Sequence, residues 1–299
     1  MTIRIGYACI NTQLQSPNRT CRLANATPER VIELGRQNLN TLAEILTWNH
    51  QHGIQLFRIS SETIPLASHP AVKVQWWEEL APEFCRVGAI IRETGVRVSM
   101  HPGQFTVLNS PREEVIIASL AELEYQTRFL DLLGVDSSSK LVLHLGGVYG
   151  DIQASMQRFI ESARGLPEGI LRRLVLENDE RNYSVEEVLH VSEAVGVPVV
   201  FDVFHHTWKP SLTSLSLTQI IERCAATWGA ADGRQKIHYS DPWPGKPPGS
   251  HSQSVDVLAF ERFYHQVQGM QLDIMLEVKD KEQSVLALYD RIPELRHSI

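Results

Sequence analysis

Residues 140–179 read KLVLHLGGVYGDIQASMQRFIESARGLPEGILRRLVLEND, and this stretch decides the fold. It opens with a short apolar run that reaches His144, and it closes with a second such run, LVLEND, that contains Glu177. Between the two runs, residues 151–163 have the period of an amphipathic helix. A strand, a helix and a second strand in this order are typical of a βα unit in a parallel sheet.

The same alternation recurs along the whole chain. Eight short β-type runs are IRIGYA (3–8), QLFRIS (55–60), VRVSM (96–100), KLVLHL (140–145), LVLEND (174–179), VPVVFD (197–202), KIHYS (236–240) and DIMLEV (273–278). Helical segments follow them at 27–52, 76–94, 113–133, 151–163, 184–195, 217–225, 255–267 and after residue 281. Eight such units predict an α/β fold, one closed (β/α)8 TIM barrel over residues 1–299. No G-x-G-x-x-G turn follows the first run, which counts against a doubly wound open sheet.

Composition argues against several other classes of protein. No apolar run reaches the roughly 18 residues of a membrane helix, and the N-terminus lacks the pattern of a signal peptide. We therefore expect a soluble, cytoplasmic protein with no membrane partner. The four cysteines contain no C-x-x-C pair, so we expect neither a thiolate zinc site nor a disulfide framework. They are Cys9, Cys21, Cys85 and Cys224.

The charge of the chain gives no general attraction for nucleic acid. The formal net charge is −7, whereas proteins that bind phosphate backbones are usually basic. Residues 1–28 are an exception, because they contain Arg4, Arg19 and Arg22 but no Asp or Glu. These arginines could form a local basic strip that contacts DNA, or they could simply be solvated surface residues.

Six of the runs end on residues that bind metals or transfer protons. Carboxyl ends of parallel strands meet at one rim of a barrel, so these side chains are expected to converge. Taken singly, each histidine could be a hydrogen-bonded core residue and each carboxylate a helix cap. Taken together, they would bury several like charges, which is costly unless cations lie between them. The six are His101, His144, Glu177, Asp202, His238 and Glu277.

Three more histidines, His69, His205 and His251, follow other strands and bring the predicted ligands to nine. Nine ligands would hold about two to three divalent ions, with Glu177 as a bridge. Imidazole and carboxylate together suit Mn²⁺ or Zn²⁺. Because His205 and His206 are adjacent, we expect only one of them to bind. The remaining histidines lie on predicted helices or helix ends, where solvated surface is the expected environment; they are His50, His52, His190, His265 and His297.

The loop PGQFTVLNS, which follows His101, places an amide and an aromatic ring at the predicted metal site. Phe105 could pack onto a helix and close the top of the barrel, because an exposed phenyl ring is costly. Alternatively, Phe105 could enter a base stack while Gln104 fills the space left by an extruded nucleotide. The residues alone do not separate these two interpretations.

Nine motifs in chain order resemble those of the UV damage endonuclease family. They cover Ile5 to Glu282, nearly the whole chain, and HPGQF, LENDE and KIHYSD are the most specific of them. The resemblance implies a TIM barrel related to endonuclease IV and to xylose isomerase-like barrels. The motifs are GYACIN, NRTCRLAN, LFRISSETIPLASHP, RVSMHPGQF, LVLHLGGVYG, LVLENDE, DVFHH, KIHYSD and MLEVKDKE.

The resemblance further implies a Mn²⁺-dependent repair enzyme for double-stranded DNA. It would nick immediately 5′ of cyclobutane pyrimidine dimers and 6-4 photoproducts, and relatives also cut abasic sites. All nine predicted ligands match family positions. Lys236 matches a lysine that the family can carry in carboxylated form, although it could also be an ordinary cation facing phosphate. Tyr7, Asn11 and Gln104 match positions that touch the lesion, whereas Phe105 replaces the family's usual tyrosine and lacks its hydroxyl.

The expected mechanism is attack on phosphorus by a metal-activated water. Glu177, Lys236, His238 and Glu277 are the expected catalytic residues, and Arg19 is expected to help offset phosphate charge. We expect the chain to act as a monomer. Two alternatives remain at this stage: a divalent-metal sugar isomerase or epimerase on the same barrel, and a damage-binding module without catalytic activity.

Overall fold

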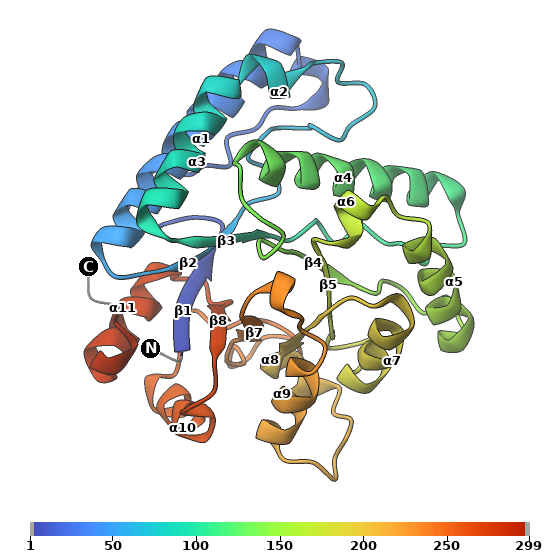
Figure 1. Cartoon of the computed structure of the whole chain (residues 1–299), viewed down its shortest axis with the longest axis vertical. Helices are drawn as coiled ribbons and strands as arrows, with labels where there is room; N and C mark the ends of the chain where they lie inside the picture. Colours follow the sequence, from blue (N-terminus) through green and yellow to red (C-terminus); the bar gives the residue numbers. More distant parts are fainter. Residues whose placement is uncertain (1–2, 297–299) are drawn as a thin grey trace.

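The structure is a computed structural model that describes residues 3–296. Eight parallel strands form one closed sheet, in which each strand pairs with the next and the last pairs with the first. Helices surround this sheet (Figure 1). The predicted (β/α)8 barrel is therefore confirmed. Its strands are β1 (Ile3–Ala8), β2 (Leu56–Ile59), β3 (Arg97–Met100), β4 (Leu141–His144), β5 (Leu174–Glu177), β6 (Val199–Asp202), β7 (Gln235–Tyr239) and β8 (Leu272–Leu276).

The helices mostly follow the strands as the sequence predicts. The α-helices are α1 (Pro28–Gln51), α2 (Trp76–Glu79), α3 (Ala81–Thr94), α4 (Glu113–Leu132), α5 (Ile152–Arg164), α6 (Glu168–Leu171), α7 (Val185–Val195), α8 (Val203–Trp208), α9 (Leu217–Ala225), α10 (Val257–Val267) and α11 (Glu282–Arg291). Short 3-10 helices are η1 (Leu23–Asn25), η2 (Ala230–Asp232) and η3 (Pro293–Leu295). Local capping explains several of these bounds. Thr27 accepts a hydrogen bond from the Arg30 amide before α1, and Ser184 with Glu187 forms a capping box before α7.

Two helical segments differ from the prediction. The single helix expected over residues 76–94 is divided at Leu80 into α2 and α3. Pro82 explains the break, because it has no amide hydrogen to donate to the carbonyl four residues earlier. The segment after β6 was expected to be a loop but forms α8, which Asp202 caps by accepting a hydrogen bond from the His205 amide at 2.7 Å.

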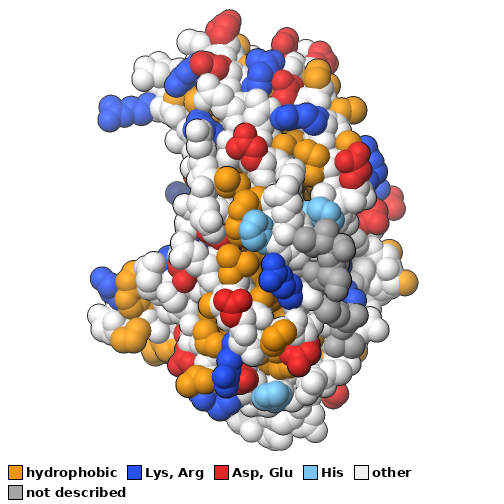
Figure 2. Space-filling view, turned by 90° about the vertical axis from the view of Figure 1, so that its left-hand side faces the viewer, with side chains coloured by type: hydrophobic (Ala, Val, Ile, Leu, Met, Phe, Trp, Pro, Cys, Tyr) orange, Lys and Arg blue, Asp and Glu red, His pale blue; other side chains and the backbone are white. Residues whose placement is uncertain are grey.

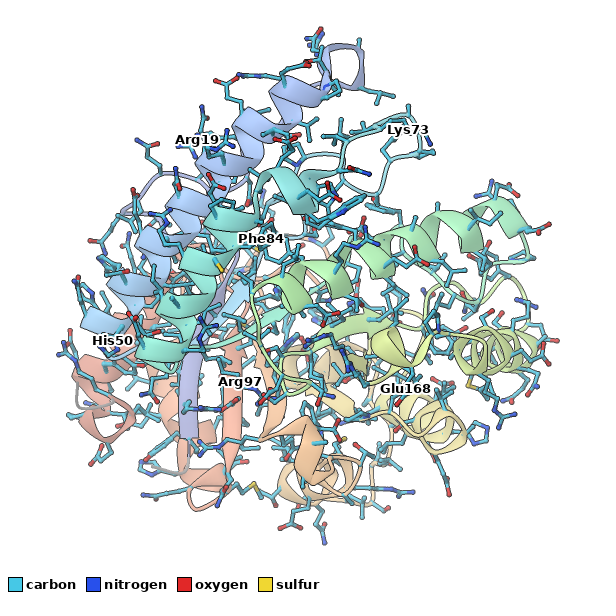
Figure 3. The ribbon with its side chains drawn as sticks, turned by 45° about the horizontal axis from the view of Figure 1, so that its top comes forward. Arg19, His50, Lys73, Phe84, Arg97 and Glu168 are labelled. Atoms are coloured by element: carbon cyan, nitrogen blue, oxygen red, sulfur yellow. The ribbon has the colours of Figure 1, made fainter. Side chains whose placement is uncertain are left out.

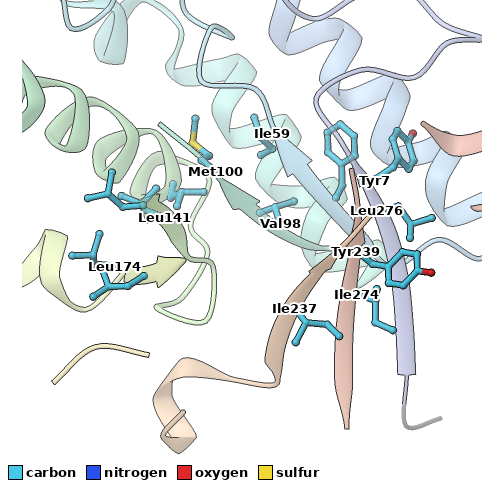
Figure 4. Packing of buried hydrophobic residues seen from close by; sticks show 14 of the residues in the cluster. Tyr7, Ile59, Val98, Met100, Leu141, Leu174, Ile237, Tyr239, Ile274 and Leu276 are labelled. Carbon is cyan, nitrogen blue, oxygen red and sulfur yellow. The ribbon is translucent and has the colours of Figure 1, made fainter. Parts of the chain in front are cut away.

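Successive side chains of each strand point alternately out of the barrel and into it, so the apolar core has an outer and an inner part. Side chains such as Val98, Ile237 and Ile274 face outward and pack beneath the helices (Figure 4). The intervening positions form two small apolar groups inside the barrel. These groups are Ala8, Leu56 and Met275, and Val142, Val175 and Val200.

The N-terminal end of the barrel is closed by ion pairs. Arg4 donates to Asp273 through Nε at 2.6 Å and Nη2 at 2.7 Å, and Arg97 Nη1 donates to the same carboxylate at 2.6 Å. Burial would raise the pKa of Asp273, but the two arginines hold it below its usual range. Lys140 pairs with Asp232 at 2.5 Å nearby. Arg4 is thus held at this end of the barrel, so it does not form a basic strip with Arg19 and Arg22 beside the mouth.

Other expectations from composition concern the whole chain. Within residues 3–296, no helix has both the length and the apolar character needed to cross a membrane. All four cysteines are free thiols, as their spacing predicted. His190 and His265 are exposed on helices, and His52 stacks on Trp48 with ring centroids 3.7 Å apart. His297, expected on the surface, lies outside the described residues.

Candidate metal centre

The strand alternation that fills the barrel interior also positions the polar residues at its mouth. Val142, Val175 and Val200 face inward, so the residues two positions later, His144, Glu177 and Asp202, face the same side. The register then brings them together across neighbouring strands: His144 is opposite Glu177, and Asp202 is opposite His238. The predicted convergence at the carboxyl ends of the strands is therefore what the structure shows for these residues.

Glu177 lies at the centre of this cluster, with only 1% of its side chain exposed. His238 Nδ1 lies 2.5 Å from Oε1, while His101 Nε2 and His144 Nε2 lie 3.1 and 3.4 Å from Oε2. Burial would raise the pKa of Glu177, but His238 and His144 hold it well below its usual range. The carboxyl group therefore remains ionised and keeps both oxygens as acceptors.

Two sets of potential ligands share Glu177. In each set, one atom from every residue lies within 4.8 Å of the others, a spacing that lets a single ion contact all three. Because the carboxylate has two oxygens, it can serve both sets at once, as expected for a bridging ligand. The sets are His101, His144 and Glu177, and Glu177, Asp202 and His238.

Several buried atoms of the cluster have no hydrogen-bond partner within the described part of the chain. Such atoms cost free energy unless a ligand satisfies them. Imidazole nitrogens and carboxylate oxygens in one site suit divalent transition ions. These residues therefore fit a metal ion. The atoms are His144 Nδ1, Asp202 Oδ2, His238 Nε2 and His251 Nδ1.

His205, His251 and Glu277 extend the cluster. His205 Nδ1 lies 3.6 Å from Asp202 Oδ2, and its ring centroid lies 5.7 Å from that of His251. His251 Nε2 lies 3.6 Å from Glu277 Oε2, and His238 Nδ1 lies 3.3 Å from Glu277 Oε1. His206 points elsewhere and packs edge-on against Phe201. The helical turn of α8 thus directs only the first of the two adjacent histidines toward the cluster.

The protonation states of the cluster follow from burial and from neighbouring charges. Burial lowers the pKa of His144 to about 4, so its imidazole is neutral near pH 7. Burial raises the pKa of Asp202 to about 6. Burial also acts to lower the pKa of His205, but the carboxylate of Asp202 raises it to about 9. In the absence of an ion, the Asp202–His205 pair therefore holds a proton that a cation would displace.

His69, like His205, His251 and Glu277, belongs to neither set, and it lies in a different part of the mouth. It is in the loop between β2 and α2, where its Nδ1 accepts a hydrogen bond from the Ala71 amide at 3.1 Å. Ser68 Oγ donates to Glu122 Oε2 at 2.5 Å, which attaches this loop to α4. Its role as a ligand stays a prediction.

Lys236 lies inside the barrel, two residues before His238 on β7. Its side chain is almost completely buried, and Nζ has no hydrogen-bond partner among residues 3–296. Burial, followed by the charge of Arg97, holds its pKa well below the usual range. An amine buried at this depth is not the solvated cation that faces phosphate.

The loop after β3 projects from the mouth. Gln104 is exposed, and Phe105 has 65% of its surface exposed. The ring lies over Gly103, where a Cβ would come within 2.4 Å of Phe105 Cε1. The structure therefore does not show the predicted packing of Phe105 onto a helix, and it leaves the ring available for contact with a base.

Tyr7 and Asn11 are placed differently from Gln104. Tyr7 is fully buried between the barrel and α1, where its hydroxyl donates to Asn49 Oδ1 at 2.6 Å and accepts from Asn11 Nδ2 at 2.9 Å. Asn11 is 1% exposed. A direct contact between DNA and either side chain would require the loop after β1 to move, so their lesion-binding role stays a prediction that this geometry does not support.

Arg19 lies beside α1 at the periphery, whereas Arg97 lies among the strands (Figure 3). The Arg19 guanidinium donates to the Ser16 carbonyl at 2.9 Å, to Thr41 Oγ1 at 3.1 Å and to Gln15. These contacts hold the loop of residues 15–19 against α1. A role of Arg19 in binding DNA stays a prediction.

Sequence reasoning missed two charged residues at the mouth. Arg58, from β2, donates to Glu277, and Glu180, after β5, places Oε2 3.9 Å from His205 Nε2. The alternation within LFRIS contains the signal for Arg58, because Leu56 faces the barrel interior and the residue two positions later faces the same way. Both residues line a pocket of about 320 Å³ beside the ligand cluster.

A second pocket, of about 270 Å³, adjoins the first. The two share His101, Gln104 and His144, and Gly147 and Asn182 also line the second. Viewed in profile, one edge of the molecule is concave, on the left of Figure 2, between two projecting parts. A concave surface of this kind can receive an extended strand of nucleic acid.

Comparison with known proteins agrees with this geometry. The family model UV-endonuclease UvdE matches residues 3–298. A UV DNA damage endonuclease of Clostridium perfringens is 39% identical over 99% of this chain and 72% of its own length. The crystal structure of SacUVDE superposes with a TM-score of 0.93 at 41% identity, covering 99% of this chain and 100% of that one.

A more distant structure shares the fold alone. Endonuclease IV from Thermus thermophilus has a TM-score of 0.59 at 14% identity, covering 97% of this chain and 99% of that one. The family match favours the nuclease over the sugar isomerase and excludes the damage-binding module without catalytic activity. The chain therefore belongs to the UV damage endonuclease family, and it is an enzyme that acts on damaged DNA.

Proposed function

We propose that this enzyme nicks the phosphodiester bond immediately 5′ of cyclobutane pyrimidine dimers and 6-4 photoproducts in double-stranded DNA, and that it also cuts at abasic sites. The observation that carries the proposal is the position of Glu177, which two sets of ligand atoms share at an open barrel mouth. Pairs of divalent ions bridged by one carboxylate are well suited to phosphodiester hydrolysis.

The proposed cofactor is Mn²⁺, with about two to three ions per chain and Zn²⁺ as the alternative metal. Bound there, these ions would lower the pKa of a water molecule and offset charge on the phosphate. The proposed ligands are the nine predicted residues: His69, His101, His144, Glu177, Asp202, His205, His238, His251 and Glu277.

The catalytic roles proposed for the protein residues follow from their positions. Glu177 and Glu277 would hold the ions, and His238 would orient both carboxylates, because it contacts each of them. Lys236 lies deeper in the barrel, two residues before His238 on β7. Burial lowers the pKa of its amine, which favours the neutral form that carboxylation requires. Carboxylated Lys236 would add an anionic group beneath His238.

Lesion selection is proposed to depend on the cost of extrusion. A dimer weakens stacking and pairing, so a damaged pair costs less to extrude than an intact one. Gln104 and Phe105 are exposed at the mouth, and Gln104 lines both pockets, so the two side chains could fill the space that the lesion leaves. Tyr7 in β1, and Asn11 and Arg19 in the loop that follows, are proposed to bind DNA, although all three are hydrogen bonded within the protein.

Other parts of the proposal concern the whole molecule. We propose that residues 1–299 act as one endonuclease domain, because the strands that close the barrel come from both halves of the chain. We also propose that it acts as a monomer, since each of the two ligand sets is supplied by one chain. A repair enzyme for chromosomal DNA works inside the cell, so we propose an intracellular, cytoplasmic location.

The test is incubation with an end-labelled duplex that carries one defined dimer, with and without Mn²⁺. The proposal expects a single cut 5′ of the dimer that requires the ion, leaving a 3′-hydroxyl and a 5′-phosphate. An intact duplex of the same sequence serves as the control. A cut at another position, or cleavage that persists in a chelator, would refute the proposed reaction.

A further inference from the structure

We propose that Arg58 is a catalytic residue whose guanidinium binds a non-bridging oxygen of the scissile phosphate. The inference rests on the proposed function, because it places the phosphate beside the ligand sets that share Glu177. It adds a guanidinium to a barrel mouth where the proposed ligands are imidazoles and carboxylates. Its basis is the position of Arg58 and the incomplete set of partners around its side chain.

Arg58 lies in the wall of the pocket next to the ligand cluster. Only 13% of its side chain is exposed. The pocket of about 320 Å³ is also lined by His101, His144 and Glu277, so a phosphate held by the cluster would occupy it. Among the described residues of this wall, Arg58 is the one Lys or Arg.

The guanidinium of Arg58 has few partners in the protein. Nη1 donates to Glu277 Oε1, and Nε is buried without a hydrogen-bond partner. Across residues 3–296, Glu277 is the one hydrogen-bond partner of this side chain. Because a guanidinium carries five N–H donors, most of its hydrogen-bonding capacity is unused.

Two other buried arginines show that this fold can satisfy a guanidinium completely. Arg173 donates through all three nitrogens to the Asp131 carboxylate and to three carbonyls. Arg97 likewise uses all three, reaching the Asp273 carboxylate and three carbonyls. Both lie at the N-terminal end of the barrel. Arg58 differs from them in lying at the mouth and in lacking such carbonyl partners.

The arrangement of the N–H donors of Arg58 indicates which group its guanidinium binds. Guanidinium groups bind phosphate oxygens bidentately, and hydrogen bonds between charged groups are short and strong. The contact with Glu277 holds one nitrogen of Arg58 and keeps the side chain in the pocket. The remaining donors can then face a phosphate oxygen whose negative charge grows during the reaction, where a fixed cation lowers the barrier.

The first test measures DNA binding without cleavage. Duplexes with one dimer carry either a phosphodiester or an uncharged methylphosphonate at the bond 5′ of the dimer. Their dissociation constants are measured by fluorescence anisotropy in a chelator, so that no metal ion contributes. The wild-type protein is expected to bind the methylphosphonate duplex about tenfold more weakly than the phosphodiester duplex. For Arg58→Gln the two dissociation constants should differ by less than about threefold, because this variant lacks the guanidinium that would bind the charged oxygen.

The second test separates Arg58 from metal binding. Arg58→Gln is expected to lower the single-turnover cleavage rate with Mn²⁺ by about 10² to 10³. Its affinity for Mn²⁺, measured by calorimetry, is expected not to fall, because the substitution frees Glu277 Oε1 and leaves every proposed ligand in place. Arg58→Lys should cleave at least about tenfold faster than Arg58→Gln, because it keeps the charge but not the fork. The matched control is Arg164→Gln, which removes an exposed arginine at the end of α5.

Two results would overturn the inference. One is an equal loss of affinity for the methylphosphonate in wild type and Arg58→Gln. The other is a cleavage defect that saturating Mn²⁺ restores, because Arg58 would then act only by holding Glu277. Failure of the proposed function gives a different result, since the wild-type protein would not cut the dimer-containing duplex with Mn²⁺ at all.

Discussion

The two ends of this barrel both bury charged side chains, but they differ in how those charges are satisfied. At the N-terminal end, Arg4 and Arg97 donate hydrogen bonds to both oxygens of the Asp273 carboxylate. Arg173 donates hydrogen bonds through all three of its side-chain nitrogens. At the mouth, His144 Nδ1, Asp202 Oδ2 and other buried atoms have no partner among the described residues. A cluster of charged residues therefore does not by itself mark a functional site. The unpartnered atoms within it do.

Energetics explain the difference. Burying a charge costs several kcal/mol unless other groups compensate it, so a purely structural cluster must complete every hydrogen bond within the protein. A site that receives ions and a phosphate must leave atoms free for them. In TIM barrels the N-terminal end commonly serves stability and the C-terminal end catalysis. The comparison between the two ends can be tested by removing one group from each.

The largest effect is expected for Glu177→Ala, which removes the residue common to both ligand sets. Nicking of UV-irradiated plasmid should fall by about 10³ or more, because both proposed ions lose a ligand. Thermal unfolding should be affected less than by Asp273→Ala, because an imidazole that loses the Glu177 carboxylate can lose its proton, whereas a guanidinium stays charged. Near-normal incision would overturn the role given to Glu177.

At the opposite end, Asp273→Ala is expected to affect stability instead. It leaves the partly buried Arg4 and Arg97 without their shared carboxylate, so the free energy of unfolding should fall by about 3 kcal/mol. Urea denaturation measures this change. Binding of Mn²⁺ to the folded variant should match wild type, and a large loss of Mn²⁺ affinity would show that the two ends are not independent.

A smaller effect is expected for Phe105→Ala at the exposed tip of the mouth. Loss of base stacking should weaken binding to dimer-containing duplex by about 1–3 kcal/mol, without changing stability or Mn²⁺ affinity. Phe105→Tyr, which keeps the ring, is the matched control and should retain wild-type affinity. Equal affinities for all three proteins would mean that the ring does not contact the lesion.

The smallest effect is a pH dependence of stability that comes from Asp273 at the N-terminal end of the barrel. Because the folded-state pKa of Asp273 is depressed, its contribution to stability is present above its unfolded pKa of about 3.9 and is lost as pH falls through the folded value. The stability difference between wild type and Asp273→Asn should therefore narrow below about pH 4. Urea denaturation at several pH values measures it, and a constant difference down to about pH 2 would contradict the assignment.

Much of the fold could be predicted because its signals are local. Period-two runs, the Thr27 cap and the Ser184–Glu187 capping box each act within a few residues, and the strands and most helices formed where these signals placed them. The break at Leu80 was also local, and Pro82 could have revealed it. The helix α8 was harder to predict, because its cap, Asp202, also ends a strand.

The candidate site was predictable in part, for a related reason. Strand ends converge in any parallel barrel, so His144, Glu177 and Asp202 could be grouped without coordinates. Alternation could also have placed Tyr7 outside the barrel, in phase with Ile5, and Arg58 inside it. Whether a buried group has partners depends on distant residues, as between Arg4 and Asp273, and only the tertiary structure shows this.

The most direct test is a crystal structure grown with Mn²⁺ and measured at the manganese absorption edge. The account predicts at least two anomalous peaks that share Glu177, one contacting His101 and His144 and the other contacting Asp202 and His238. It would be contradicted if manganese bound elsewhere, or if those side chains completed their hydrogen bonds with one another and with water while the protein still cut damaged DNA.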